Sequence, residues 1–223
     1  MNVQEATTRR LPDLKERHLP ENCRETINTI LKETYGYEQF RNLEIYDDLS
    51  KGKEKLCISQ GQLIENVILE AEKAWKGETQ VDNILLTAPT GSGKSLLFQL
   101  PAIYLGKEYN LLTIVVSPLK ALIVDQVESL QELGYTRVAY ASSDLSPEQK
   151  MEVYRQVREG EIDLFYLSPE LLLSYDIKHF VGERRIGLVV VDEAHTVTTW
   201  GKEFRVDYWF LGRYLTALKQ TLG

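Results

Sequence analysis

Cysteine is scarce in this sequence, and positive charge is not in excess. The 223 residues contain only two cysteines, Cys23 and Cys57, and neither has the spacing to a second cysteine or to a histidine that is typical of a zinc site. So few thiols fit a reducing compartment. The formal net charge of −7 excludes a chain that is basic over its whole surface, so any contact with nucleic acid must come from a local patch.

Long apolar runs are also absent. The first residues, Met1–Glu5 followed by Arg9 and Arg10, lack the apolar centre of a signal peptide, and no run approaches the length that spans a bilayer. We therefore expect a soluble, cytoplasmic protein without a membrane partner. A hydrophobic content of 43% is enough for one substantial core and a small satellite domain.

Runs with helical and strand-like spacing alternate along the chain. Helices are predicted at 21–35, 59–75, 95–105, 119–133, 147–159 and 208–219, with a short helical run at 169–173. Strands are predicted at 84–86, 111–116, 137–141, 162–167 and 186–191. Continuous apolar strands between helices predict an α/β fold with a mostly parallel, doubly wound sheet that helices cover on both faces. The charged run Lys51–Lys55 marks the predicted boundary between an N-terminal helical extension, residues 1–55, and the α/β domain, residues 56–223.

The central motif is a glycine-containing turn, Ala-Pro-Thr-Gly-Ser-Gly-Lys-Ser at 88–95, between a predicted buried strand and a helix. It fits the phosphate-loop pattern G-x-x-x-x-G-K-[ST] except that Ala88 replaces the first glycine. Glycines allow successive N–H groups to turn toward an anion at a helix N-terminus, where the helix dipole also favours negative charge. The pattern predicts an ATP site formed by Thr90, Gly91, Ser92, Gly93, Lys94 and Ser95, with Lys94 on the β and γ phosphates and Ser95 on Mg²⁺.

An acidic tetrad, Asp192-Glu193-Ala194-His195, follows the last strand-like run. Because the carboxyl ends of parallel strands meet at one edge of a sheet, we expect this tetrad beside the phosphate loop. Asp192 would then bind Mg²⁺, and Glu193 would orient or deprotonate the attacking water. A solvated pair of acids after a strand is the simpler alternative, but the upstream phosphate loop favours the functional interpretation.

These two motifs resemble motifs I and II of superfamily 2 helicases, and the RecQ family in particular. The resemblance extends from Tyr35 to Tyr208. Three further stretches carry it: 35–41 resembles the adenine-side motif F-G-Y-x-x-F-R, 117–126 resembles motif Ia, and 199–208 resembles the aromatic-rich loop after motif II. Residues 166–170, Tyr-Leu-Ser-Pro-Glu, look like the next strand-end motif. The aromatic-rich loop is the most family-specific signal.

The resemblance implies the first RecA-like lobe of an ATP-dependent DNA helicase, which uses ATP and Mg²⁺ to move along single-stranded DNA and to unwind partially duplex DNA. In a prokaryote it would be nucleoid-associated. It implies that Lys94, Asp192, Glu193 and His195 form the catalytic set. It also implies that Tyr35 and Arg41 lie on the adenine side of the nucleotide.

One departure from the family concerns the glutamine that reads adenine. The adenine-side motif continues x-x-Q in the family, but the residue three positions after Arg41 is Glu44. The helical pattern instead places Gln60 in the family's register, as though an insertion of about 16 residues interrupted the motif. Gln60 is therefore the predicted adenine contact, with Gln62 as the second choice.

Residues for nucleic acid are predicted in two places. Trp200 and Phe204 beside Lys202 and Arg205 offer stacking faces with cations, which suits single-stranded DNA. From the residues alone, an aromatic anchor in the core is an equally good interpretation of this loop. Three strand-end residues could hold backbone phosphates, although each alone is more often a turn residue: Ser117, Lys120 and Ser168.

A second RecA-like lobe is not seen in these residues. We expect it in the same, longer chain or in trans, since a missing arginine finger costs on the order of a thousandfold in rate. The chain alone should bind ATP but scarcely hydrolyse it. Two rival functions stay open from sequence, namely a DEAH-type RNA helicase lobe and a non-catalytic nucleotide-binding adaptor.

Overall fold

The computed structural model describes residues 17–46, 55–78, 80–86, 91–193 and 211–217. Its backbone contacts divide the chain into two compact units. The first, here called the N-terminal unit, comprises Met1–Glu70 and Val81–Pro101. The second, here called the sheet unit, comprises Ala71–Gln80 and Ala102–Gly223. Two helices run from one unit into the other.

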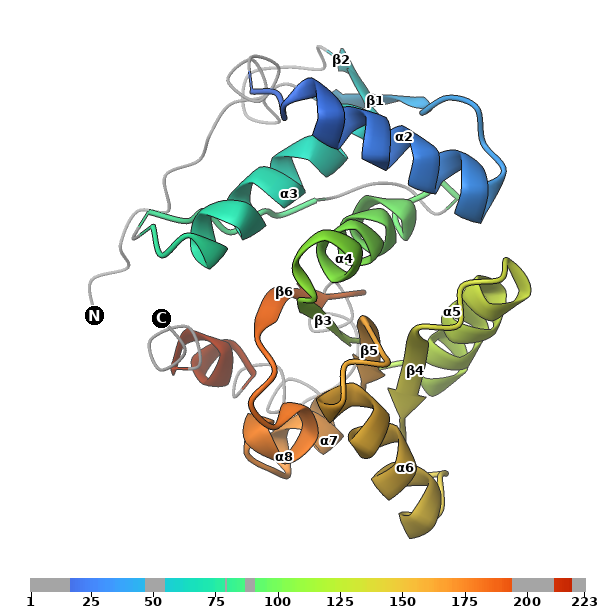
Figure 1. Cartoon of the computed structure of the whole chain (residues 1–223), viewed down its shortest axis with the longest axis vertical. Coiled ribbons are helices and arrows are strands. Elements are labelled where there is room, and N and C mark those ends of the chain that lie inside the picture. The colour runs from blue at the N-terminus through green and yellow to red at the C-terminus, as the bar shows by residue number, and fades with distance from the viewer. Residues whose placement is uncertain (1–16, 47–54, 79, 87–90, 194–210, 218–223) are drawn as a thin grey trace. The chain divides into compact units, whose positions relative to one another are not determined.

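The N-terminal unit combines helices with a small antiparallel hairpin (Figure 1). Its elements are α2 (Glu21–Tyr35), β1 (Asn42–Tyr46), β2 (Lys55–Ser59) and the first parts of α3 (Gln60–Trp75) and α4 (Leu96–Tyr109). Helix α2 has the predicted bounds and buries Ile27, Ile30 and Leu31. It ends where Gly36 takes a left-handed conformation with φ 69°, which glycine adopts without steric penalty.

The sheet unit contains a four-stranded parallel sheet in the order β4-β5-β3-β6. Its strands are β3 (Leu112–Val116), β4 (Val138–Ala141), β5 (Leu164–Leu167) and β6 (Ile186–Val191). Its helices, besides the ends of α3 and α4, are α5 (Lys120–Glu132), α6 (Pro147–Arg158), α7 (Pro169–Leu173) and α8 (Ile177–Val181), and residues 211–217 are also helical. This architecture confirms the predicted α/β fold.

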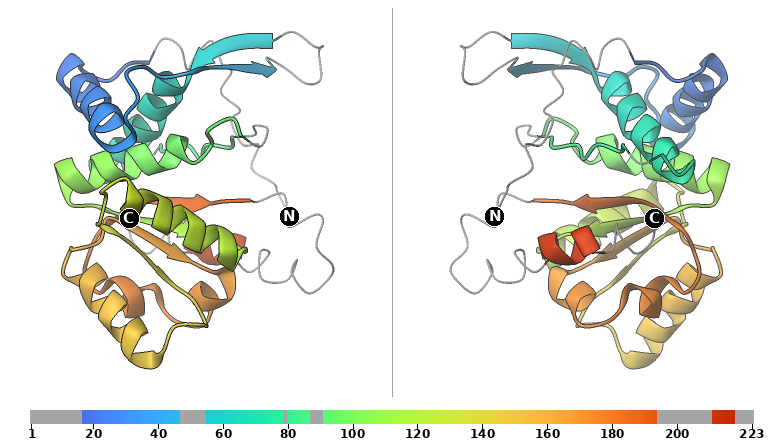
Figure 2. Two further views of the ribbon diagram at one scale, coloured as in Figure 1. Left: turned by 90° about the vertical axis from the view of Figure 1, so that its right-hand side faces the viewer. Right: turned by 90° about the vertical axis from the view of Figure 1, so that its left-hand side faces the viewer.

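Both faces of the sheet are covered by helices (Figure 2). On one face, Leu112, Ile114 and Val116 of β3 share a core with Tyr154 of α6 and Phe180 of α8. Successive side chains of a strand point to opposite faces, so the intervening residues of β3, which are also buried, face the other way. Helix α5 contributes a separate buried row, Ile123, Val127 and Leu130. Strands buried on both faces explain why the sequence shows continuous apolar runs rather than alternation.

The predicted strand before the phosphate loop is wrong. Residues 80–86 contain no strand, and Leu85 is 84% exposed, with Ile84 and Leu86 also exposed. A strand requires a neighbour that supplies the hydrogen-bond ladder, and no strand of the described residues pairs with this stretch. Three apolar residues were too short a pattern on which to infer such a partner.

Two elements were not predicted at all, namely the β1–β2 hairpin and α8. The two strands of the hairpin flank the charged run and share only Lys55 with it. Helix α8 has only five residues, fewer than a helical period can reveal. Among the described residues, no helix is long and apolar enough to cross a membrane.

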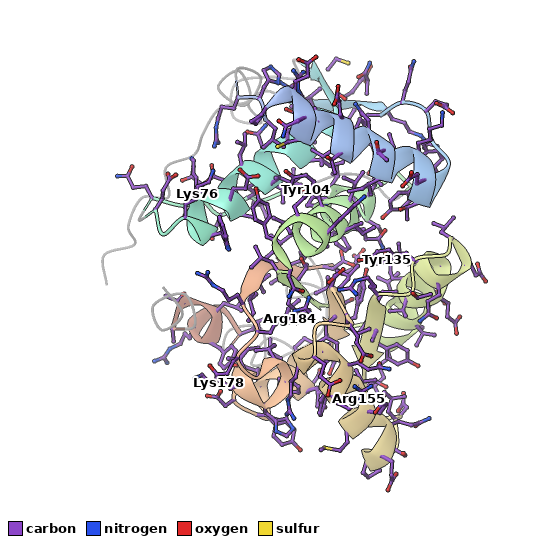
Figure 3. The ribbon with its side chains drawn as sticks, viewed as in Figure 1. Lys76, Tyr104, Tyr135, Arg155, Lys178 and Arg184 are labelled. Carbon is purple, nitrogen blue, oxygen red and sulfur yellow. The ribbon has the colours of Figure 1, made fainter. Side chains whose placement is uncertain are left out.

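A buried carboxylate ties several segments of the sheet unit together. Asp163, just before β5, accepts hydrogen bonds from Arg137 at 2.6 and 2.8 Å, from Arg184 at 2.9 Å and from the Tyr135 hydroxyl at 3.0 Å. Figure 3 labels Tyr135 and Arg184. The side chain of Arg184 is only 5% exposed, and its burial lowers the pKa of its guanidinium, whereas the hydrogen bond to Asp163 raises that of Arg137.

The first prediction concerns the charge of this cluster. In Asp163→Asn, Arg184 stays buried without its anionic partner, and breaking a buried pair in this way destabilises proteins by about 3–5 kcal/mol. We expect a loss of this size in the free energy of unfolding, measured by urea denaturation. Glu183→Gln is the control, because Glu183 pairs with Lys178 at 3.8 Å on the surface and such pairs contribute little. Equal stability of the two variants would contradict the prediction.

The second prediction concerns how closely α4 approaches Asp163. A Cβ added to Gly106 would lie 2.4 Å from Asp163 Cγ, whereas one added to Gly212 would meet nothing within 4 Å. Gly106→Ala should therefore destabilise the fold by about 1–3 kcal/mol through overpacking. Gly212→Ala, the matched change in an open helical position, should be neutral or stabilise by up to about 1 kcal/mol. Thermal unfolding of both variants measures this, and the opposite ranking would refute it.

Candidate functional site

The phosphate loop leads directly into α4. Gly91 and Gly93 have φ 80° and 79°, a conformation that is strained for residues with a side chain. The Ser95 carbonyl accepts from Gln99 N at 2.9 Å, so Ser95 stands at the helix start and Lys94 immediately before it. Both side chains are half-buried. The glycine turn, the lysine and the helix N-terminus together fit a polyphosphate.

Gln60 connects this loop to the adenine-side motif within the N-terminal unit. Its Nε2 donates to the carbonyl oxygen of Ser92 at 3.2 Å and to that of Gly93 at 3.5 Å. Its Oε1 accepts from Arg41 N at 3.2 Å. The residue is 2% exposed, and a Cβ on Gly93 would lie 2.6 Å from its Nε2. Gln60 therefore fills the space that the second loop glycine leaves open.

The β1–β2 hairpin explains how Gln60 comes to lie beside Arg41, although 18 residues separate the two in sequence. Strands β1 and β2 pair antiparallel, with Asn42 opposite Ser59, so the residues on either side of the hairpin are neighbours. Gln60 N donates to Arg41 O at 2.9 Å. Glu44, which occupies the family's glutamine position in sequence, instead pairs with Cys57 in the middle of the ladder. These contacts favour Gln60 over Gln62 as the residue equivalent to the family's glutamine.

The aromatic part of the adenine-side motif forms a planar surface beside α4. The Tyr35 hydroxyl donates to Gln99 Oε1 at 3.3 Å. The rings of Tyr35 and Tyr37 are 6.5 Å apart and 13° from parallel, and the Arg41 guanidinium carbon lies 5.8 Å from the centre of the Tyr37 ring. Tyr37 and Gln99 were not among the predicted site residues. Tyr37 is 47% exposed, so its ring is not packed in the core, whereas Tyr35 and Phe40 are half-buried.

The acidic pair lies at the carboxyl end of β6. Asp192 N donates to Val116 O at 2.9 Å and so extends the pairing with β3. Its Oδ1 accepts from Glu193 N at 2.9 Å. Glu193 has φ 50°, an uncommon conformation for a residue other than glycine. Such strained positions cluster at functional sites, so the backbone geometry supports a special role for Glu193.

Three buried serines follow the neighbouring strands: Ser117 after β3, Ser142 after β4 and Ser168 after β5. Ser168 Oγ accepts from Leu171 N at 3.3 Å and caps α7, which agrees with the turn-residue alternative. Ser117 is 1% exposed, and its Oγ has no hydrogen-bond partner within the described part of the chain. Among the described residues the Ser117 hydroxyl is thus unused, and the Ser168 hydroxyl, which accepts one bond, still has a hydrogen to donate to a ligand.

Lys120 is the first residue of α5. Its ammonium donates to Asp144 Oδ1 at 3.0 Å and to Ser143 Oγ. Sequence reasoning missed Ser142, Ser143 and Asp144, although the rule that identified Ser117 could have found them, since they also follow the carboxyl end of a predicted strand. The remaining predicted residues lie outside the described ones: Thr90, His195, Trp200, Lys202, Phe204 and Arg205.

Comparisons with known proteins agree with the motifs. The family model for the DEAD/DEAH box helicase matches residues 62–222. The ATP-dependent DNA helicase RecQ of Synechocystis sp. is 34% identical over 202 residues, which cover 90% of this chain and 35% of that protein. RecQ of Bacillus subtilis is 32% identical over 180 residues, 81% of this chain and 25% of that protein.

A eukaryotic relative shows the same similarity over a shorter stretch. The ATP-dependent helicase SGS1 of Saccharomyces cerevisiae is 37% identical over 134 residues, 58% of this chain and 9% of that protein. The chain thus spans 35% or less of the length of these curated relatives. The predicted resemblance is confirmed, and this chain belongs to the DEAD/DEAH box helicase family, in which it is similar to the RecQ helicases.

Proposed function

We propose that this chain is the ATP-binding lobe of a RecQ-like DNA helicase, which couples ATP hydrolysis to movement along single-stranded DNA and to duplex unwinding. The observation that carries the proposal is the double bonding of Gln60, to Arg41 N on one side and to the phosphate loop on the other. It joins the adenine side to the phosphate side of one nucleotide site. The similarity to proteins named ATP-dependent DNA helicases supports the choice of DNA.

In this proposal the nucleotide is held by residues of two kinds. Backbone N–H groups of Gly91, Ser92 and Gly93, with Thr90 before them, surround the phosphates, and Lys94 binds the β and γ phosphates. Tyr35 and Arg41 lie on the side of the base. Gln60 contacts the edge of the base by exchanging one of the bonds of its buried amide, which in the structure go to Arg41 N and to the loop carbonyls. Mg²⁺ neutralises phosphate charge when bound, with the Ser95 hydroxyl and the Asp192 carboxylate as its protein ligands, since Mg²⁺ prefers few carboxylates together with phosphate oxygens.

Hydrolysis is assigned to Glu193, which accepts a proton from the attacking water or orients it. His195 completes the catalytic set. Phosphates of single-stranded or partially duplex DNA contact Ser117, Lys120 and Ser168. The bases stack on the aromatic-rich loop with Trp200 and Phe204, while Lys202 and Arg205 add positive charge.

Two organisational features belong to the same proposal. Residues 1–55, whose described part holds α2 and β1, are assigned to an N-terminal extension that carries the adenine-side motif, and residues 56–223 to the first RecA-like lobe. The second lobe, in the same longer chain or in trans, supplies the arginine that completes the ATPase site. The lobe described here therefore positions ATP and DNA, while full turnover requires its counterpart.

The third prediction tests the phosphate contact of Lys94. A charge-assisted hydrogen bond contributes about 1.5–3 kcal/mol, so Lys94→Ala should lower the affinity for ATP by at least about tenfold. Titration with a fluorescent ATP analogue measures this. Lys107→Ala, in the last turn of the same helix, removes an equal charge from an exposed position and should leave the affinity unchanged. Unaltered binding by the Lys94 variant would contradict the assignment of the phosphate loop.

The fourth prediction tests the catalytic role of Glu193 and the choice of DNA. In the full-length protein, Glu193→Gln should retain ATP binding but lose about 100-fold or more of its DNA-stimulated turnover, because general base catalysis contributes at least this much. Glu108→Gln, an exposed position on α4, serves as the control. Unchanged turnover in the Glu193 variant would favour a non-catalytic adaptor. Stronger stimulation by RNA than by DNA of the same sequence would favour the RNA-directed alternative.

A further inference from the structure

We propose that Asp144 is a built-in competitor of the nucleic-acid phosphate at Lys120. The carboxylate of Asp144 binds the Lys120 ammonium, to which a phosphate of the DNA backbone would otherwise bind. Asp144 therefore sets how tightly the DNA strand is held at this edge of the sheet. The inference rests on the proposed function, because it requires that Lys120 contacts the strand. It assigns a role to a residue outside the helicase motifs.

The contact between the two side chains is direct and reinforced. Lys120 Nζ lies 3.0 Å from Asp144 Oδ1 and also donates to Ser143 Oγ. Ser143 Oγ donates in turn to the same Asp144 oxygen at 3.2 Å. The hydrogen bond to Lys120 lowers the pKa of the Asp144 carboxyl group, so this group is an anion at neutral pH. A carboxylate oxygen on an ammonium stands in for a phosphate oxygen, since both form charge-assisted bonds to the same donor.

The backbone around Asp144 fixes this anion in place. Asp144 N donates to the Oγ of Ser142 at 3.3 Å, and Ser142 is buried at the end of β4. On the other side, α6 begins with a capping box in which Gln149 N donates to Ser146 Oγ at 3.2 Å and Ser146 N donates to Gln149 Oε1 at 2.8 Å. The segment between β4 and α6 is therefore anchored at both ends. The backbone position of Asp144 near Lys120 is therefore set by the bonds on both sides of this segment.

Other features around Lys120 suit an anion from outside. Lys120 opens α5, a helix of 13 residues whose N-cap, Leu119, makes no side-chain capping bond. The first N–H groups of such a helix lack intrahelical partners and attract negative charge. Ser117, which follows β3 just before this helix, carries the buried hydroxyl with no partner in the described residues. A cation, an uncapped helix start and an unused hydroxyl thus occur within four successive residues of the chain.

The size of the effect follows from exposure. The side chains of Lys120 and Asp144 are 47% and 70% exposed, and exposed pairs are weak enough that removing the competitor should tighten strand binding by only about two- to fivefold. The salt dependence should change as well. Each phosphate contact with a single strand contributes about −0.7 to the slope of log affinity against log salt, so a fully available Lys120 should make the slope steeper by up to about 0.7.

The fifth prediction is therefore that Asp144→Asn binds single-stranded DNA more tightly than the unaltered chain. Binding of a fluorescent oligothymidylate, measured by anisotropy over a series of salt concentrations, should show the two- to fivefold gain at low salt and the steeper slope. Glu132→Gln makes the same change of charge in the last turn of α5 and should change neither quantity. An equal gain in both variants would attribute the effect to net charge and would overturn the proposal.

Lys120→Gln separates a failure of this inference from a failure of the proposed function. This variant should bind the oligonucleotide more weakly, and adding Asp144→Asn to it should produce no gain beyond that of the Glu132 control. If Lys120→Gln weakens binding but Asp144→Asn has no effect, the competition is refuted and the strand contact stands. If Lys120→Gln leaves binding unchanged, the assignment of Lys120 to the strand is itself wrong, and the competition falls with it.

Discussion

Within the N-terminal unit, two segments depend on one buried side-chain amide. Gln60 bonds through its oxygen to the backbone of Arg41 and through its nitrogen to the carbonyls of Ser92 and Gly93. A buried amide left without partners would cost about 1–3 kcal/mol, so the loop and the adenine-side motif are held in register by the need to satisfy this group. Position 93 requires glycine for two reasons: its φ is positive, and a Cβ there would clash with the Gln60 amide.

The sheet unit is governed by a different constraint, the common direction of its strands. Parallel strands end at the same edge, and the residues that follow β3, β4, β5 and β6 are Ser117, Ser142, Ser168 and Asp192. At the opposite edge of the sheet, just before β5, the Asp163 carboxylate accepts hydrogen bonds from two arginines and a tyrosine. The candidate site residues at one edge and the ion pairs at the other are thus separated by the length of the strands.

Sequence alone could predict the elements with a long and regular pattern. Helix α2, helix α3 and strand β6 lie within one residue of their predicted bounds, because each carries its own period of apolar residues. The hairpin could not be predicted, since its two strands are separated by a charged run that is typical of a linker. Residues Ile84–Leu86 were mistaken for a strand because three apolar residues do not show whether a neighbouring strand pairs with them. The prediction for Gln60 came from the family resemblance, which names a glutamine at this place in the motif. The strand-end rule could have pointed to Asp144, but its contact with Lys120 is seen only in the fold.

In the proposed function an acidic chain contacts a polyanion, and this requires local features such as those around Lys120. The net charge of −7 opposes nucleic acid at long range, yet salt screens such fields within about 10 Å at ordinary ionic strength, so contact is decided by the nearest groups. A motor that moves along a strand has to release each phosphate as readily as it binds it. In the proposed competition, Asp144 lowers the difference in free energy between the phosphate-bound and phosphate-free states of Lys120. The reason is that the ammonium pairs with a carboxylate whenever the phosphate leaves.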